Sequence, residues 1–182
     1  KFALAEGADL EIIRAAALLH DSVGSAPGNP GEARAEHHIL SAIFARQVLT
    51  EEGWAEERIQ AVEHCIRAHR FRNKGEKPQT IEAQVLFDAD KLDVLGAIGA
   101  ARTIAYAALD GQPSYAEPSQ QFLETGVKQP GEPHSSYHEY LFKLRNVEKR
   151  LFTQTARLIA RQRGEYLEEF FNQLIAEYKG ER

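Results

Sequence analysis

Apolar residues recur every three to four positions along most of this chain, which is the spacing that places them on one face of an α-helix. One such face is formed by Val62, Cys65, Ile66 and His69, at positions i, i+3, i+4 and i+7. No segment alternates apolar and polar residues over the length of a strand, and Ala, Leu, Glu and Arg, which favour helices, dominate. The pattern therefore predicts an all-α fold.

Glycine, proline and capping residues divide this pattern into separate helices. A first helix is expected to end at Glu6-Gly7, and Asp9 is expected to cap a second one that runs to about Asp21. Further helices are predicted over residues 32–52, 55–69, 80–109, 137–151 and 153–179. A basic turn, 70–78, and a segment rich in Gly, Pro, Ser and Gln, 110–136, connect some of them. A connection as long as 110–136 is usually functional, and we interpret it as a lid.

Composition narrows the range of functions. The 182 residues suit one domain, or one domain with an appendage, and their net charge of −5 argues against binding a nucleic acid polymer through its phosphates. The single cysteine, Cys65, excludes a disulfide within the chain and indicates a reducing, cytoplasmic setting, while its apolar neighbours favour inert packing. No apolar run approaches the length needed to span a membrane. We therefore expect a cytoplasmic protein that does not enter a membrane.

The candidate chemistry lies at the end of the most apolar helix, where His20 and Asp21 follow the segment Leu10–Leu19. The partial negative charge of a helix C-terminus suits a histidine but opposes a buried aspartate, which needs a compensating cation. A divalent metal ion would provide it, since such ions accept imidazole and carboxylate ligands. The other interpretation is an ordinary helix end, at which Asp21 pairs with Arg67 or another basic residue.

A second acidic cluster follows at Asp88-Ala-Asp-Lys-Leu-Asp93. Asp90 and Asp93 are three residues apart and are expected to share a face of their helix, whereas Asp88 is rotated away and suits a capping or orienting role. Together, His20, Asp21 and Asp90 would give a metal ion three ligands and leave room for water.

These motifs carry a resemblance to a known family. Ala-Ala-Leu-Leu-His20-Asp21-Ser-Val-Gly24, followed by Val85-Leu-Phe-Asp-Ala-Asp90-Lys-Leu-Asp93, resembles the HD superfamily of metal-dependent phosphohydrolases, in particular the bacterial HD hydrolases that act on nucleotides. The late segments 136–144 and 153–161 fit the same group. The resemblance implies one HD-domain helical bundle over 1–182, with a metal-site core at 1–109, the lid at 110–136 and C-terminal helices at 137–182 packed on the core.

The family pattern implies four metal ligands: a first histidine, the pair His20 and Asp21, and a last aspartate, which here is Asp90. The first histidine should lie on the helix before the turn at Gly7. Residues 1–6 contain no histidine, so we expect that the N-terminal helix is truncated.

The resemblance also implies roles around the metal. In several relatives a histidine at the position of His37 assists at the substrate phosphate or joins a second metal, so His37 is a catalytic candidate. Either Asp21 or Asp93 would orient or deprotonate the attacking water. The candidates for substrate binding, which carry a positive charge or an imidazole near the predicted site, are Lys91, His69, Arg70, Arg72 and His138.

The predicted function is hydrolysis of a phosphate ester or anhydride in a nucleotide, with pyrophosphate release from a nucleoside triphosphate as one form. The cofactor would be a divalent ion among Mn, Mg, Ni, Co, Fe and Zn. Alternatives are a hydrolase of another phosphorylated metabolite or signalling nucleotide, a non-catalytic HD domain that senses a nucleotide, and a structural helical protein whose acidic clusters only form ion pairs. The long C-terminal helix suits either the core or the surface of a homodimer.

Overall fold

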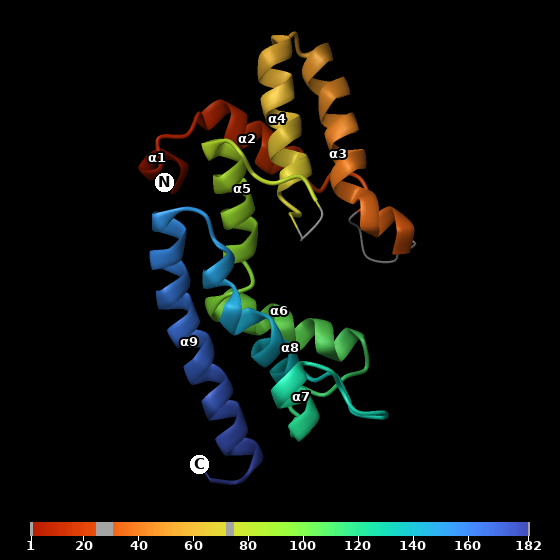
Figure 1. Cartoon of the computed structure of the whole chain (residues 1–182), viewed down its shortest axis with the longest axis vertical. Coiled ribbons are helices and arrows are strands. Elements are labelled where there is room, and N and C mark those ends of the chain that lie inside the picture. Colours follow the sequence, from red (N-terminus) through yellow and green to blue (C-terminus); the bar gives the residue numbers. More distant parts are fainter. Residues whose placement is uncertain (1, 25–30, 72–74, 182) are drawn as a thin grey trace. The chain divides into compact units, whose positions relative to one another are not determined.

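The computed structural model describes residues 2–24, 31–71 and 75–181, and for residues 31–34 it describes the backbone alone. Over these residues the chain forms nine α-helices and two short 3₁₀-helices, and no strand (Figure 1). The all-α prediction is therefore confirmed. The helices divide into two compact units, residues 1–90 with 151–156 and residues 91–150 with 157–182. That they form one domain stays a prediction.

The first unit is built around a long antiparallel helix pair. Its helices are α1 (Phe2–Ala5), α2 (Leu10–Leu19), α3 (Gly31–Glu51), α4 (Glu56–Ala68) and α5 (Ile81–Leu92), the last two residues of which belong to the second unit. Helices α3 and α4 lie side by side, and α2 packs against both (Figure 1). Their buried apolar side chains form one core with α5: Ile12, Ala16, Ala42, Ala45, Leu49, Ile59, Val62, Cys65, Ile66, Ala68, Ala83 and Leu86. This core fixes the three helices that carry the candidate histidines.

Helix α2 begins where the sequence predicts, because Asp9 caps it. The Asp9 carboxylate accepts hydrogen bonds from the backbone N–H of Glu11 (2.9 Å) and of Ile12 (3.2 Å). The Arg58 guanidinium also donates to this carboxylate (3.0 Å), and this bond is the main reason why the pKa of Asp9 lies below its usual value. The helix ends at Leu19, immediately before the His-Asp pair.

The predicted continuous helix over 80–109 is wrong, because the chain turns between α5 and α6 (Gly96–Leu109). Gly96 has a φ of +70°, a left-handed conformation that favours glycine. A Cβ atom on Gly99 would overlap the carbonyl group of Val94. The apolar pattern continues through the break, so periodicity alone could not reveal it. As a result Asp93 lies in the turn and does not share a helix face with Asp90.

The second unit contains α6, α7 (Gln120–Thr125), α8 (Ser136–Phe142), η1 (Leu144–Asn146), η2 (Glu148–Arg150) and most of α9 (Gln154–Tyr178). The predicted helix over 137–151 is wrong beyond Phe142, where two 3₁₀ turns follow. Leu144 and Val147 are both buried there, at the spacing of three that a 3₁₀-helix aligns on one side. Segment 110–136, predicted as a loop, contains α7, whose Phe122 is buried.

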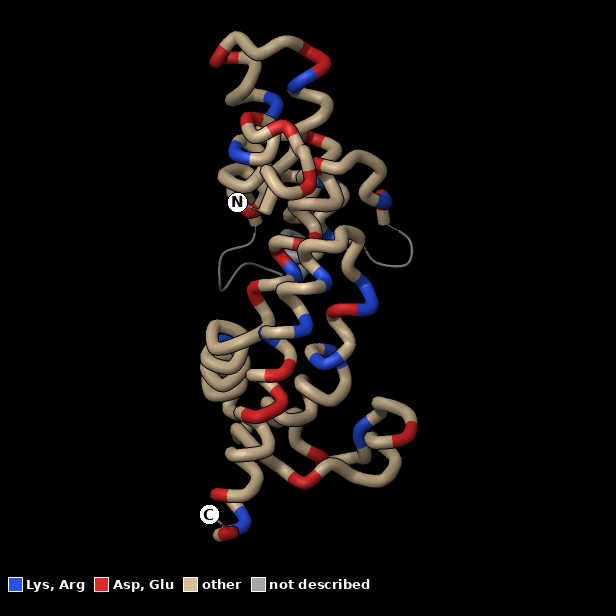
Figure 2. The backbone as a smooth tube through the Cα atoms, turned by 90° about the vertical axis from the view of Figure 1, so that its left-hand side faces the viewer, with Lys and Arg blue, Asp and Glu red and all other residues tan. Residues whose placement is uncertain are grey.

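Charged residues of both signs are mixed along the backbone of each unit, as Figure 2 shows. Several of them pair across helices; Arg46 on α3, for example, bonds to Glu63 on α4 through two nitrogens. Among the described residues no single helix is long and apolar enough to cross a membrane, although the bent pair of α5 and α6 reaches that length and composition when taken together.

Candidate metal centre

The His-Asp pair is held at the end of α2 by backbone hydrogen bonds. The N–H of His20 donates to the carbonyl of Ala16 (2.9 Å), and the N–H of Ser22 donates to the carbonyl of Leu19 (3.3 Å), so the chain is bonded to the helix on both sides of Asp21. Just beyond the pair, the N–H of Val23 donates to the hydroxyl of Ser41 (3.2 Å), and this hydroxyl donates back to the carbonyl of Val23 (3.3 Å). Ser41 is fully buried on α3, and its hydroxyl holds both the N–H and the carbonyl of Val23, two residues after Asp21.

Three histidines from three helices converge on Asp21. Nε2 of His37, on α3, lies 3.2 Å from Oδ1 of Asp21, and Nε2 of His69, at the end of α4, lies 3.7 Å from the same oxygen. Nε2 of His20 lies 3.7 Å from Oδ2. One ligand atom from each of Asp21, His37 and His69 fits within 4.8 Å of the others, which is the geometry of a group that could hold a metal ion.

Two of these imidazoles present a lone pair to the cluster. Nδ1 of His69 lies 2.6 Å from the carbonyl of Ile66, and Nδ1 of His20 lies 2.8 Å from the carbonyl of Ala17. A carbonyl oxygen only accepts, so each Nδ1 carries the hydrogen and each Nε2 is unprotonated in the neutral ring. This arrangement, in which one ring nitrogen is anchored to the backbone and the other is exposed to the cluster, is typical of histidine ligands. Two imidazole nitrogens and a carboxylate oxygen suit a borderline divalent ion.

The side chains of the cluster differ in how far they are exposed to solvent. The His69 side chain is only 4% exposed, whereas that of Asp21 is 48% exposed. The cluster is therefore buried on the side of α4 and open to solvent at the carboxylate. An ion or a substrate would reach it from the side of Asp21.

A fourth histidine, His38, stays outside this cluster. Its Nδ1 atom is buried and has no hydrogen-bond partner among the described residues. Burial, followed by the nearby His37 and the charge of Arg70, lowers the pKa of His38. A second proton, which would make the ring cationic, would be poorly solvated, so we assign His38 a packing role in its neutral form.

The three aspartates of the acidic cluster differ in their surroundings: Asp88 and Asp90 lie on α5, and Asp93 lies in the turn after it. Asp88 is fully buried, and its carboxylate accepts hydrogen bonds from the N–H groups of Phe152 and Thr153 and from the Thr153 hydroxyl. This confirms that Asp88 orients the chain. Asp90, two residues later and partly buried, belongs to the same unit as the histidines, and its role as a metal ligand stays a prediction. Asp93 is 60% exposed and lies 3.9 Å from Arg102. Its catalytic role also stays a prediction.

The predicted substrate-binding residues differ in their surroundings. Arg70, just after α4, donates to the ring of His37 and so borders the cluster. Arg72 lies outside the described residues. Lys91 is partly buried near the end of α5, and its predicted contact with substrate is untested.

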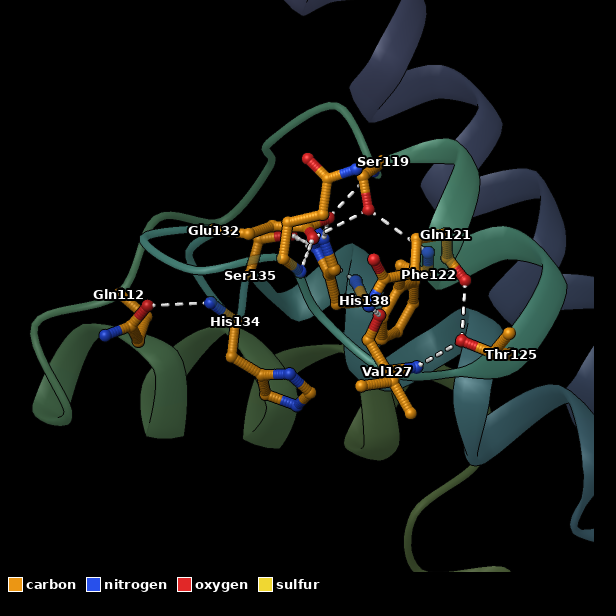
Figure 3. A network of polar contacts seen from close by, with 11 residues as sticks. Gln112, Ser119, Gln121, Phe122, Thr125, Val127, Glu132, His134, Ser135 and His138 are labelled. Carbon is orange, nitrogen blue, oxygen red and sulfur yellow. Dashed lines mark hydrogen bonds and ion pairs between the residues drawn. The ribbon is translucent and has the colours of Figure 1, made fainter.

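His138 is a different case, because its ring is 0% exposed and both its nitrogens are bonded, to Glu132 and to Ser135. These bonds would have to break before His138 could contact a substrate, and its role in substrate binding stays a prediction. Figure 3 shows the network that surrounds it.

The sequence indicated most residues of the cluster, but not the serine that holds the chain beside it. The apolar stripe of α4 indicated that His69 would point inward, and the structure places its Nε2 beside Asp21. Ser41 was not predicted, because a serine among helical residues gives no sequence signal that its hydroxyl fixes a loop eighteen residues earlier.

The chain is similar in sequence and in structure to several known proteins. The family model for the HD domain matches residues 1–95. YpgQ of Bacillus subtilis is 30% identical over 178 residues, which span 96% of this chain and 76% of YpgQ. The crystal structure of YpgQ in complex with ADP matches with a TM-score of 0.71 at 30% identity, covering 96% of this chain and 80% of that chain. The crystal structure of an HD-superfamily hydrolase from Bacillus thuringiensis matches with a TM-score of 0.69 at 29% identity, covering 98% of this chain and 79% of that chain. The similarity thus extends over nearly the whole chain.

Proposed function

Because the chain belongs to the HD domain family, whose model matches residues 1–95, we propose that it is a metal-dependent phosphohydrolase that acts on a nucleotide. The convergence of Asp21 with the Nε2 atoms of His20, His37 and His69 carries this proposal. The similar hydrolase from Bacillus thuringiensis supports the reaction class. The complex of YpgQ with ADP supports a nucleotide as the substrate.

The residues that would hold the ion are Asp21, His20 and His69, with Asp90 as the further ligand that the family pattern implies. Both imidazoles have their Nδ1 atoms bonded to backbone carbonyls, so the Nε2 atom of each ring is the one that faces Asp21. When bound, a divalent ion supplies Lewis acidity toward a phosphoryl oxygen and toward water.

Side chains of the protein would orient the attacking water and bind the phosphate. The exposed carboxylate of Asp21 would accept a hydrogen bond from the attacking water and orient it. His37 would donate from Nε2 to a phosphoryl oxygen, on which negative charge develops during hydrolysis. Arg70, which borders the cluster through its bond to His37, would add positive charge on the side of the phosphates.

The test is a panel of nucleoside mono-, di- and triphosphates, incubated with the full chain and each of Mn, Mg, Co, Ni, Fe and Zn, with products identified by chromatography. We expect one nucleotide class to be hydrolysed only when a divalent ion is present. The variant Asp21→Asn should lose at least about a hundredfold in kcat/KM, because even outer partners of a metal site contribute about 10- to 100-fold.

Asp110→Asn is the matched control, since Asp110 is exposed at the end of α6 and should leave the rate unchanged. The proposal fails if no nucleotide is hydrolysed under any of these conditions. Binding of a nucleotide by calorimetry without any product would instead indicate a sensor.

A further inference from the structure

Arg70 forms a bond that determines how the ring of His37 is protonated. One nitrogen of its guanidinium, Nη1, lies 2.7 Å from the carbonyl oxygen of Ala35 and 3.0 Å from Nδ1 of His37. Nη1 carries two hydrogens, one for each of these acceptors. Arginine is always charged and can only donate, so Nδ1 of His37 must be the acceptor.

The hydrogen of the neutral His37 ring therefore lies on Nε2. That nitrogen is the one that faces the cluster, at 3.2 Å from Oδ1 of Asp21 and 3.3 Å from Nε2 of His69. Both neighbours are acceptors, since Asp21 is a carboxylate and the hydrogen of His69 is directed to Ile66. Flipping the His37 ring would place carbon atoms against Arg70 and Asp21 and lose both bonds.

The three imidazoles of the cluster therefore belong to two chemical kinds. His20 and His69 present a lone pair to Asp21, because backbone carbonyls bind their Nδ1–H groups. His37 presents an N–H, because Arg70 occupies its lone pair. Only the first kind can ligate a metal through Nε2 without a change of tautomer.

We propose that Arg70 is a positioning residue that holds His37 in the Nε2–H tautomer, so that His37 donates a hydrogen bond to the substrate phosphoryl group and is not a metal ligand. The catalytic part of this inference rests on the proposed phosphohydrolase function. The assignment of the tautomer rests only on the contacts of Arg70 and His37.

The test is long-range ¹H–¹⁵N correlation NMR of the imidazole rings in uniformly ¹⁵N-labelled, metal-free protein. We expect His37 to show a protonated Nε2, and His20 and His69 to show a protonated Nδ1. In Arg70→Met the His37 signals should shift toward a mixture of tautomers, and Arg70→Lys, which keeps a cationic donor, should restore the original pattern at least in part.

Arg67→Met is the matched control, because Arg67 lies on α4 one turn earlier and pairs with Glu76, not with a histidine. It should leave the His37 pattern unchanged. Addition of Zn²⁺, which is diamagnetic, should leave the Nε2 proton of His37 in place. Loss of that proton on zinc binding, an Nδ1–H pattern in the wild type, or an unchanged pattern in Arg70→Met would each overturn the proposal.

Kinetics give a second readout if the chain hydrolyses a nucleotide. Arg70→Met should lower kcat by up to about 100-fold, because part of the His37 rings would then present a lone pair to the phosphoryl oxygen in place of an N–H donor, and the metal affinity should be unchanged. An equal loss of metal affinity would contradict the assignment. If the wild type hydrolyses nothing, the proposed function fails, while the NMR pattern still decides whether Arg70 sets the tautomer.

Discussion

The arrangement of the candidate centre depends on a few buried polar side chains whose hydrogen bonds are made over long sequence separations. Ser41 fixes the chain after Asp21, and Asp88 fixes the segment that leads into α9. Such groups are stable inside a protein only when their donors and acceptors are satisfied. Replacing a single donor or acceptor atom of Ser41 or Asp88 should therefore lower the stability of the segment that it holds.

Asp88 offers the clearest test at this scale. In Asp88→Asn one acceptor oxygen becomes an NH₂ group that faces the N–H groups of Phe152 and Thr153 or the Thr153 hydroxyl. Losing charge-assisted bonds to a fully buried group should lower the free energy of unfolding by about 2 to 3 kcal/mol. Urea unfolding followed by circular dichroism measures this difference.

The matched control for Asp88→Asn is Asp110→Asn, at an exposed position, which should change the free energy of unfolding by less than about 0.5 kcal/mol. Equal stabilities of Asp88→Asn and the wild type would show that the bonds of Asp88 do not hold this segment.

Some single residues could be understood from the sequence and others could not. Cys65 was predicted to be inert, and it is fully buried, with burial raising the pKa of its thiol to about 12. The side-chain partners of His37 and His69 could not be predicted, because they depend on contacts between residues more than thirty positions apart.

At the scale of helices, the sequence predicted where most of them lie but missed interruptions that packing imposes. Asp9 correctly indicated the start of α2, and Gly7, which has a positive φ, correctly indicated that the first helix stops before it. The turn at Gly96 and the 3₁₀ segments after Phe142 were missed, because the apolar periodicity continues through both. Such breaks depend on close approaches, such as that of Gly99 to Val94, which a periodic pattern does not encode.

The segment between α6 and α8 shows how a long connection is kept folded. The Glu132 carboxylate accepts bonds from the Ser119 N–H (2.7 Å) and hydroxyl (2.7 Å), from the Gln129 N–H (2.6 Å) and from Nε2 of His138 (3.0 Å). These donors, the Ser119 N–H foremost, lower the pKa of Glu132 to about 2, although burial acts in the opposite direction. Glu132 thereby links α7 to α8.

This network predicts an acid-dependent loss of stability. A carboxyl group whose pKa is lowered on folding contributes stability that is complete above its ordinary value of 4.5 and is lost as the pH falls toward 2. Glu132→Gln should therefore be less stable than the wild type at pH 6, and this difference should shrink at pH 3. Urea unfolding at both pH values measures it.

Glu124→Gln, an exposed substitution on α7, is the control for Glu132→Gln and should show no such change between the two pH values. A difference between Glu132→Gln and the wild type that is the same at pH 6 and pH 3 would contradict the role of the ionised carboxylate.

At the scale of the whole chain, the candidate centre belongs to the first unit and draws on segments that are distant in sequence. The ends of α2 and α4 and the N-terminal part of α3 bring Asp21, His20, His37 and His69 together. The sequence indicated this convergence through the His-Asp pair and the family resemblance. It placed His69 among the substrate-binding residues, and the structure places Nε2 of His69 beside Asp21 itself.

The most direct measurement of the central claim is the metal content of the purified full chain, after saturation with Mn²⁺ or Zn²⁺ and dialysis, measured by mass spectrometry of the elements. The account predicts that the wild type and Asp110→Asn retain a divalent ion. Asp21→Asn and His69→Ala, folded by circular dichroism, should bind it at least about tenfold more weakly. A wild type that retains no ion, or an Asp21→Asn variant that retains as much as the wild type, would contradict the account.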